Sequence, residues 1–289
     1  MSDPPNARIR RATSDDAKVC GRICYEAFAT INRQHNFPPE LPSVEVAAGR
    51  LGMIFSHPGF FCVVAESDGR IVGSNCMDER SKIAGIGPVT VDPSVQNQSI
   101  GRMLMHAVME RARERGFPGI RLVQATFHTR SLSLYAKLGF EVRDLFLVMH
   151  GPAIKSSIEG CVVRIATEDD LDSANRICEK VHGHDRSGDL EEAIRNGMAL
   201  VVEQNHQIKG YASGFGYPSH AVAESNLELK ALIAAATDIP RPGILVPARN
   251  ADLLRWCLAN GLRAVQPMTL MTIGLYNEPE GAWLPSVLY

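Results

Sequence analysis

The chain has 289 residues, 45% of them hydrophobic and 21% charged, which is the composition of a globular protein long enough for two ordinary domains. A formal net charge of −2 argues against a nucleic-acid binder that works through bulk positive charge. No apolar run approaches the ~18 residues of a membrane-spanning helix, and the first residues lack the apolar core of a signal peptide, so we expect a cytoplasmic protein without membrane contacts.

The cysteines and histidines do not suggest a disulfide framework or a metal centre. The seven cysteines are scattered through mostly apolar surroundings without a Cys-x-x-Cys spacing, which predicts reduced core cysteines. Cys20 and Cys24 share a helix face but lack further ligands nearby in the sequence. His182 and His184 are interpreted as the frayed end of a helix. We therefore expect no metal.

The first half of the chain predicts strands and helices joined by short turns. Thr13 or Ser14 is expected to cap the first helix, which continues through Phe28 and leads into a proline-rich connection, Ile31 to Pro42. The expected elements are a strand at 8–12, this helix, a second helix at 44–55, strands at 60–67, 71–79 and 85–91, a long helix from about residue 100, a strand at 120–126, a helix at 131–138 and a strand at 141–150.

The stretch from Val91 to Leu104 joins a strand to a helix through a polar loop. The strand GIGPVTV ends at Val91, the loop runs from Gln96 to Gly101, and apolar side chains then recur at helical spacing. A strand that enters a helix in this way directs unpaired backbone N–H groups and the positive end of the helix dipole to one place. That place suits a phosphate, although many such units bind nothing.

The pattern restarts in the second half. RRATSDDAKVCGRIC, which begins at Arg10, aligns without a gap to RIATEDDLDSANRIC, which begins at Arg164. The later strands and helices recur in the same order, and the period is too long for a solenoid. We therefore predict two copies of one mixed α/β unit, with a first domain at 1–152, a linker at 153–160 and a second domain at 161–289.

Two segments of the first copy carry a family resemblance. VDPSVQNQSIGR, from Val91 to Arg102, resembles the acyl-CoA loop of the GCN5-related N-acetyltransferases (GNAT), and HTRSLSLYAKLGF, from His128 to Phe140, resembles their second signature. Both are present in the family's order with a strand between them. The resemblance implies an α/β fold of two tandem GNAT-like domains, each a twisted, mixed and largely antiparallel sheet flanked by helices.

The same resemblance implies acetyl-CoA as cosubstrate. The pyrophosphate would lie on the loop, and the pantetheine arm would run along the strand that ends at Val91. The implied cofactor-binding residues are Val89, Val91, Gln96, Asn97, Gln98, Ser99, Ile100, Gly101, Arg102, His128, Ser131 and Tyr135. Further contacts to the 3′-phosphate are open among Arg102, Arg130 and Lys137.

Two positions depart from the family pattern. Ser99 stands where the first loop glycine is usual, and phosphate binding should survive if its φ is negative. His128 stands where asparagine is common, which puts one hydrogen bond to pantetheine in doubt.

The resemblance also implies direct attack of an amine on the thioester. Tyr135 matches the family tyrosine that hydrogen-bonds the departing sulfur. The usual glutamate base has no clear counterpart, so Asp78 and Glu79 are the candidates, with Glu26 and His35 as alternatives. No nucleophilic side chain is required, and a covalent role for Cys62 or Cys76 has no histidine to support it.

The second copy is interpreted as degenerate. It lacks the polar glycine loop, and Asn250 and Cys257 fall opposite His128 and Tyr135, so we expect no CoA there. The sequence thus predicts an enzyme, an N-acetyltransferase that acts on the primary amine of a small molecule, as a monomer or homodimer. The alternatives are a protein lysine or N-terminal acetyltransferase and a non-catalytic acyl-CoA sensor.

Overall fold

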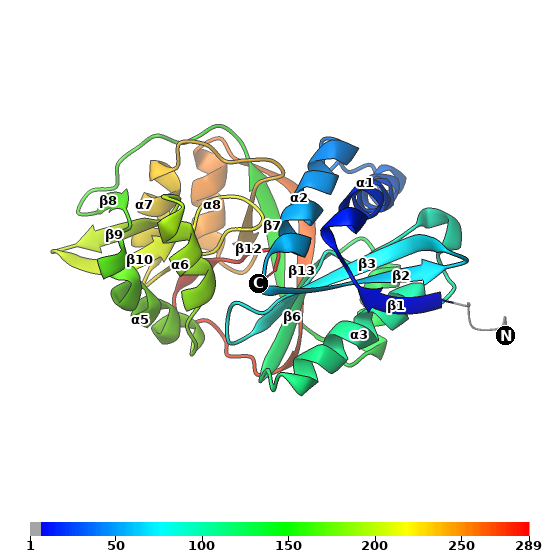
Figure 1. Ribbon diagram of the computed structural model, residues 1–289. Coiled ribbons are helices and arrows are strands. Elements are labelled where there is room, and N and C mark those ends of the chain that lie inside the picture. Colours follow the sequence, from blue (N-terminus) through cyan, green and yellow to red (C-terminus); the bar gives the residue numbers. More distant parts are fainter. Residues whose placement is uncertain (1–6, 289) are drawn as a thin grey trace.

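The computed structural model describes residues 7–288 as two mixed α/β halves that pack side by side (Figure 1). The first half contains β1 (Ala7–Arg11), α1 (Ala17–Gln34), α2 (Val44–Ser56), β2 (Phe60–Ser67), β3 (Arg70–Asp78), β4 (Ala84–Ile86), β5 (Thr90–Val91), α3 (Ile100–Glu114), β6 (Gly119–Ala125), α4 (Thr129–Lys137) and β7 (Glu141–His150). The second contains β8 (Val162–Ile165), α5 (Leu171–His182), α6 (Ser187–Arg195), β9 (Leu200–Gln204), β10 (Gln207–Ala212), β11 (Ala221–Ala223), α7 (Asn226–Ala235), β12 (Ile244–Pro247), α8 (Ala251–Ala259), β13 (Arg263–Gly274) and β14 (Ala282–Leu284).

The two halves exchange strands. The larger sheet has the order β1-β2-β3-β4-β6-β13-β7-β12, with β5 beside β3, so β13 of the second half lies between β6 and β7 of the first. In turn β7 pairs with β12, and β8 to β11 form a second sheet with β14. The mixed, largely antiparallel architecture predicted from the sequence is confirmed. The exchange was not predicted.

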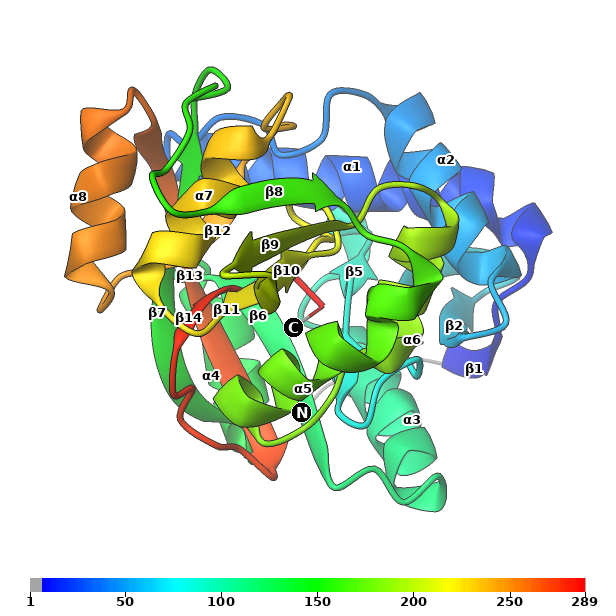
Figure 2. The same cartoon turned by 90° about the vertical axis from the view of Figure 1, so that its left-hand side faces the viewer.

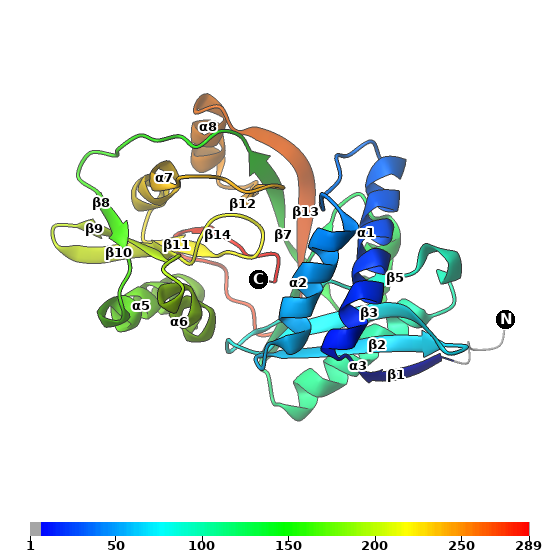
Figure 3. The ribbon, with the colours of Figure 1, turned by 45° about the horizontal axis from the view of Figure 1, so that its top comes forward.

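Helices cover both faces of each sheet (Figure 3). On the larger sheet, α1 and α2 cover one face of β2 and β3, and α3 packs on the opposite face with an apolar cluster that includes Leu104, Leu122 and Met271. Further along the first face, the core of the second half replaces α1 and α2 over β6 and β13. The open face of the larger sheet beside α1 and α2 is therefore closed by the second half.

The repeated sequence folds into a repeated ion-pair motif. Arg10 binds Asp16 at 2.7 Å and Glu66 at 2.8 Å. In the second copy, Arg164 binds Asp170, the counterpart of Asp16, at 2.6 Å. Each aspartate also completes a capping box, with Thr13 in the first copy and its counterpart in the second. The predicted alignment of the two copies therefore holds at the level of individual side chains.

Ion pairs also join the halves where α6 lies next to the first half (Figure 2). Glu192 of α6 contacts both Arg80 and His57, and Lys82 reaches Asp185 at 2.6 Å. Arg80 is itself held by Asp78 at 2.6 Å. Asp78 thus belongs to the contact between the halves.

Most of the cysteines and the histidines His182 and His184 are buried. All seven cysteines are free, and six are buried. α5 ends at His182 as expected, but the expectation that this end is frayed is wrong, because the side chains of His182 and His184 are both buried. The His182 ring packs edge-on against Trp283, and its Nε2 lies 3.3 Å from Nε2 of His220. In the described range no helix combines the length and apolarity that crossing a bilayer requires.

Candidate active site

The larger sheet opens at the strand predicted for residues 85–91. β4 runs parallel to β6 only through Ala84 and Gly85, after which the chain turns at Gly87 and Pro88 and continues as β5 against β3. Within the described residues, β3 is the strand that pairs with β5. The N–H of Asp92 bonds to Val72 of β3 at 2.9 Å, so by alternation the N–H groups of Val89 and Val91 point away from β3 into the opening. An extended ligand can therefore bind there as an added strand.

The loop that follows β5 presents the start of α3 to the same opening. Ser99 is the N-cap residue and makes no side-chain capping bond. The first amide that closes the helix is that of Met103, which bonds to the Ser99 carbonyl at 3.0 Å. The amides of the first three helical positions, from Ile100 to Arg102, are therefore available to an anion at the positive end of a 15-residue helix.

The expected backbone at Ser99 is corrected by the structure. Its φ is +63°, in the left-handed region, and that of Asn97 is +70°. Phosphate binding was expected to survive at a negative φ, but the loop keeps the shape that a glycine would adopt at Ser99. The departure from glycine thus changes the energy of the loop more than its geometry.

Gly101 leaves room between the loop and the opening. A Cβ at this position would lie 3.5 Å from Leu134 and 3.7 Å from Val91, which is ordinary contact. No clash within the protein therefore requires glycine here. The space that a side chain would fill lies between the helix start and β5, where a ligand must pass to reach both.

The charged and polar side chains around the loop divide into two groups. Arg130 of α4 contacts the side chains of Gln96 and Asn97, which ties the loop to α4. Arg102, Lys137 and the loop residues Gln98 and Ser99 are exposed. The cationic side chains near the loop thus lie on α3 and α4, where an additional phosphate could contact them.

A short polar chain runs along α4 to the buried Tyr135. Oγ of Ser131 lies 2.7 Å from Nδ1 of His128, and Ser131 also hydrogen-bonds Tyr135 one turn later. Burial lowers the pKa of His128 to about 4, so its ring is neutral at pH 7. Burial raises the pKa of the Tyr135 phenol to about 12, and the bond with Ser131 offsets part of that rise. His128, Ser131 and Tyr135 thus lie together along α4.

The four candidate bases have different surroundings. Asp78 is bound by Arg80, and Glu79 by Arg111 at 2.7 Å. Glu26 is half-buried and pairs with Arg22 at 3.1 Å. His35 is exposed and its ring lies 5.2 Å from that of Phe127, close to His128.

The structure adds residues that the sequence did not single out. Gln124 on β6 is 7% exposed, shares its sheet face with Leu122, and has no hydrogen-bond partner for either amide atom among the described residues. The available signal was a glutamine inside the apolar strand IRLVQAT. Glu40, in the connection between α1 and α2, lies within hydrogen-bonding reach of Tyr217 from the second half. No local sequence signal marks that pair.

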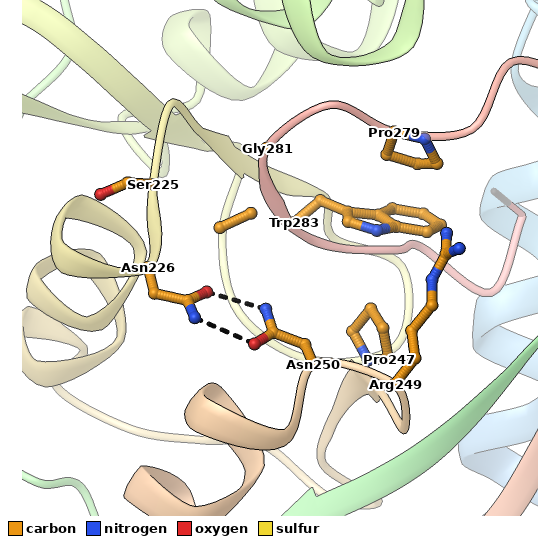
Figure 4. Close-up of a pocket in the computed structure, with 9 residues that line it drawn as sticks. Ser225, Asn226, Pro247, Arg249, Asn250, Pro279, Gly281 and Trp283 are labelled. Carbon is orange, nitrogen blue, oxygen red and sulfur yellow. Dashed lines mark hydrogen bonds between the residues drawn. The ribbon is translucent and has the colours of Figure 1, made fainter.

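The corresponding opening in the second half is occupied by its own chain. β14 pairs with β11 there. A pocket of about 420 Å³ remains beside it, lined in part by Trp283, Arg249 and the start of α7 (Figure 4). The amides of Asn226 and Asn250 bond to each other at 2.7 and 2.9 Å. These groups are satisfied within the protein, in contrast to the first half.

Comparisons with known proteins agree on one family. The family model of the GNAT acetyltransferases matches residues 25–140. A mycothiol acetyltransferase from Nocardia farcinica is 35% identical over 63 residues, which cover 22% of this chain and 21% of that protein. The match thus spans about a fifth of the relative's length.

Two solved structures match nearly the whole chain. A candidate acetyltransferase from Pyrococcus horikoshii has a TM-score of 0.71 at 23% identity, with 95% of this chain and 91% of that chain covered. A tandem GNAT protein from the clavulanic acid biosynthesis pathway has a TM-score of 0.57 at 14% identity, with 93% and 98% covered. At these identities the likeness shows the fold, including its tandem organisation.

Proposed function

We propose that the chain transfers the acetyl group of acetyl-CoA to the primary amine of a small molecule by direct attack in a ternary complex, because residues 25–140 match the family model of the GNAT acetyltransferases. The observation that carries this proposal is the combination of an open strand edge at Val89 to Val91 with the uncapped start of α3. An extended ligand with a pyrophosphate at one end matches both features at once.

The residues present fit acetyl-CoA, which when bound supplies a thioester carbonyl as the electrophile. The amides from Ile100 to Arg102 would hold the pyrophosphate, and the exposed N–H groups of β5 would bond the pantetheine arm. The unpartnered amide of Gln124 and the hydroxyl of Ser131 supply further polar contacts along the arm. Arg102, Arg130 and Lys137 remain the candidates for the 3′-phosphate.

Tyr135 supports the reaction as a hydrogen-bond donor to the leaving sulfur. With a phenol pKa of about 12, full proton transfer to a thiolate of ordinary basicity is uphill by about 5 kcal/mol. A hydrogen bond that strengthens as charge develops on sulfur avoids that cost. The buried phenol therefore stabilises the thiolate while a proton arrives from the amine.

The acceptor must lose a proton before or during attack. An amine with a pKa near 10.4 is neutral for only about one molecule in 10³ at pH 7, which corresponds to roughly 4 to 5 kcal/mol. Asp78 and Glu79 were the candidate bases, but each is engaged by an arginine. Their contacts favour a structural role in holding β3 to its surroundings.

A small acceptor is favoured because the second half closes the face of the sheet opposite α3. The connection between α1 and α2 meets Tyr217 of the second half on that face. A protein lysine or N-terminus is the enzymatic alternative, and an acyl-CoA sensor is the alternative without catalysis.

Calorimetric titration with acetyl-CoA, followed by a thiol-release assay across a panel of primary amines and lysine-containing peptides, tests these functions. Binding with release for a small amine supports the proposal. Release with peptides alone favours the protein acetyltransferase. Binding without release for any acceptor favours the sensor, and absence of binding rejects all three.

A further inference from the structure

The connection between α1 and α2 is fixed at both ends beside the opening of the sheet. Phe37 stacks on Phe127, just beyond β6, with ring centroids 4.2 Å apart. The Phe37 amide bonds to the Asn32 carbonyl at 2.9 Å, and the Asn32 side chain returns to the carbonyl of Pro38 at 3.1 Å. Leu41 is buried in the cluster under α1 and α2. Glu40 is therefore held in place between Phe37 and Leu41, which are both anchored.

Glu40 ends a chain of hydrogen-bonding groups that begins in the second half. Nε2 of Gln266 on β13 donates to the hydroxyl of Tyr217 at 2.8 Å, and that hydroxyl lies within reach of the Glu40 carboxyl. Gln266 and Tyr217 are 3% and 6% exposed. Because the glutamine donates to the phenolic oxygen, the phenol can donate its own proton to the carboxylate. The second half thus orients an acid of the first.

This chain lies on the acceptor side of the sheet. Leu122 and Gln124 face α3 and α4, whereas Met268 and Leu270, on the same side of β13 as Gln266, face the second half. On the Glu40 side, the Tyr217 carbonyl accepts a bond from the amide of Val287. The next residue, Leu288, packs its backbone directly on Gly85, the last residue of β4 that pairs with β6. Glu40 is thus linked to β4 through Tyr217 and the segment Val287–Leu288, across the sheet from the phosphate loop.

The environment of Glu40 suits proton exchange near neutral pH. Burial raises the pKa of its carboxyl to about 7, while Arg50 of α2 and Tyr217 oppose the rise. Cys24 of α1 also faces it and is neutral at pH 7, because burial raises the pKa of that thiol to about 12. Burial raises the pKa of Tyr217 as well, so the phenol keeps its proton.

We propose that Glu40 is the general base for the acceptor amine, and that Tyr217 and Gln266 of the second half position it. This inference rests on the proposed acetyltransferase function. Glu40 takes one proton from the substrate ammonium, and the neutral nitrogen attacks the thioester carbon. As the N–C bond forms and the C–S bond breaks, the second proton of the nitrogen passes to the sulfur, which Tyr135 stabilises. Glu40 then returns its proton to solvent.

The test compares Glu40→Gln with Glu45→Gln, which makes the same charge change at an exposed position of the next helix. With the best amine of the panel, Glu40→Gln should lower kcat/KM by about 100-fold or more at pH 7, as loss of a general base does. Its dissociation constant for acetyl-CoA should stay within about twofold of wild type, since the cofactor lies across the sheet. Glu45→Gln should match wild type in both measurements.

The pH profile separates catalysis from structure. The base acts when deprotonated, so wild-type kcat should rise with pH through a midpoint near the Glu40 pKa of about 7, and Glu40→Gln should lose this limb. Tyr217→Phe should keep the limb but move its midpoint upward, because the carboxylate loses a hydrogen bond that favours its charged form. A purely structural Tyr217 would leave the midpoint in place.

The results separate failure of the Glu40 role from failure of the proposed acetyltransferase function. If wild-type protein releases no thiol with any amine, the proposed function fails. If wild type is active and Glu40→Gln retains its rate and its acidic limb, only the role of Glu40 fails. Loss of acetyl-CoA binding in Glu40→Gln would also overturn the inference, because it would place the residue on the cofactor side. Glu40→Asp keeps the carboxyl, so its kcat/KM should lie between those of wild type and Glu40→Gln.

Discussion

At the scale of single residues, the site depends on side chains whose ordinary properties are changed by burial. Tyr135 and His128 are joined through Ser131, and burial raises the pKa of one and lowers that of the other. Both are therefore neutral at pH 7. The motif in the sequence indicated these positions, but the direction of each shift depends on packing that no local pattern shows.

Removing the Tyr135 hydroxyl should affect the reaction and not the binding of the cofactor. Tyr135→Phe keeps the ring and its edge-on contact with Phe140 but cannot bond the developing thiolate. We expect kcat to fall by about 10²-fold, as for loss of a single preorganised donor, with little change in acetyl-CoA affinity. Steady-state kinetics and calorimetry measure the two quantities. Unchanged turnover would remove the hydroxyl from the mechanism.

Ser99→Gly should stabilise the protein. Serine at a φ of +63° carries a backbone strain of about 1 kcal/mol that glycine avoids, although the greater freedom of glycine in the unfolded chain offsets part of this. We expect the free energy of unfolding to rise by up to about 1 kcal/mol in urea titrations. Ser156→Gly, at an exposed position without a positive φ, is the matched control and should be neutral or destabilising. Equal effects in both variants would show that Ser99 is not strained.

At the scale of elements, the strand-to-helix unit around β5 and α3 turns a break in one strand into a binding site. The sequence predicted the strands at 60–67 and 141–150 to the residue, because polar turns or glycines bound each apolar run. It predicted one strand over 85–91, where the structure has two short ones with residues 87–89 between them. The break that exposes the edge of β5 is thus the part of the site that the apolar pattern concealed.

Gly101→Ala should separate folding from cofactor binding. The added Cβ meets its neighbours at 3.5 Å or more, and alanine favours a helix more than glycine by about 1 kcal/mol, so the fold should be retained or slightly stabilised. The methyl group would occupy the space between β5 and the helix start, and we expect acetyl-CoA affinity to fall by about tenfold or more, or roughly 1.4 kcal/mol. Thermal melting and calorimetry on the same sample measure both. A stable variant with unchanged affinity would place the cofactor elsewhere.

At the scale of the whole molecule, the two copies depend on each other. The repeated motif around Arg10 and Arg164 made the duplication visible in the sequence. The exchange of β7 and β13 was not visible, because a strand with apolar faces can pair with either sheet. The hydrophobic pattern of a strand does not show which strand it pairs with. The same holds for Glu40 and Tyr217, which meet only because the halves pack together.

Cutting the chain should therefore abolish the fold of the first copy. A fragment of residues 7–152 would lack β13, which leaves β6 and β7 with open edges and uncovers the apolar face that the second half buries. Such edges and faces promote aggregation. We expect this fragment to be insoluble or to lack a cooperative melting transition when it is expressed alone. Coexpression with residues 161–288 should restore a soluble complex that binds acetyl-CoA, since both exchanged strands are then present. A soluble, cooperatively folded fragment on its own would show that the exchange is dispensable and that the first copy can form its sheet without β13.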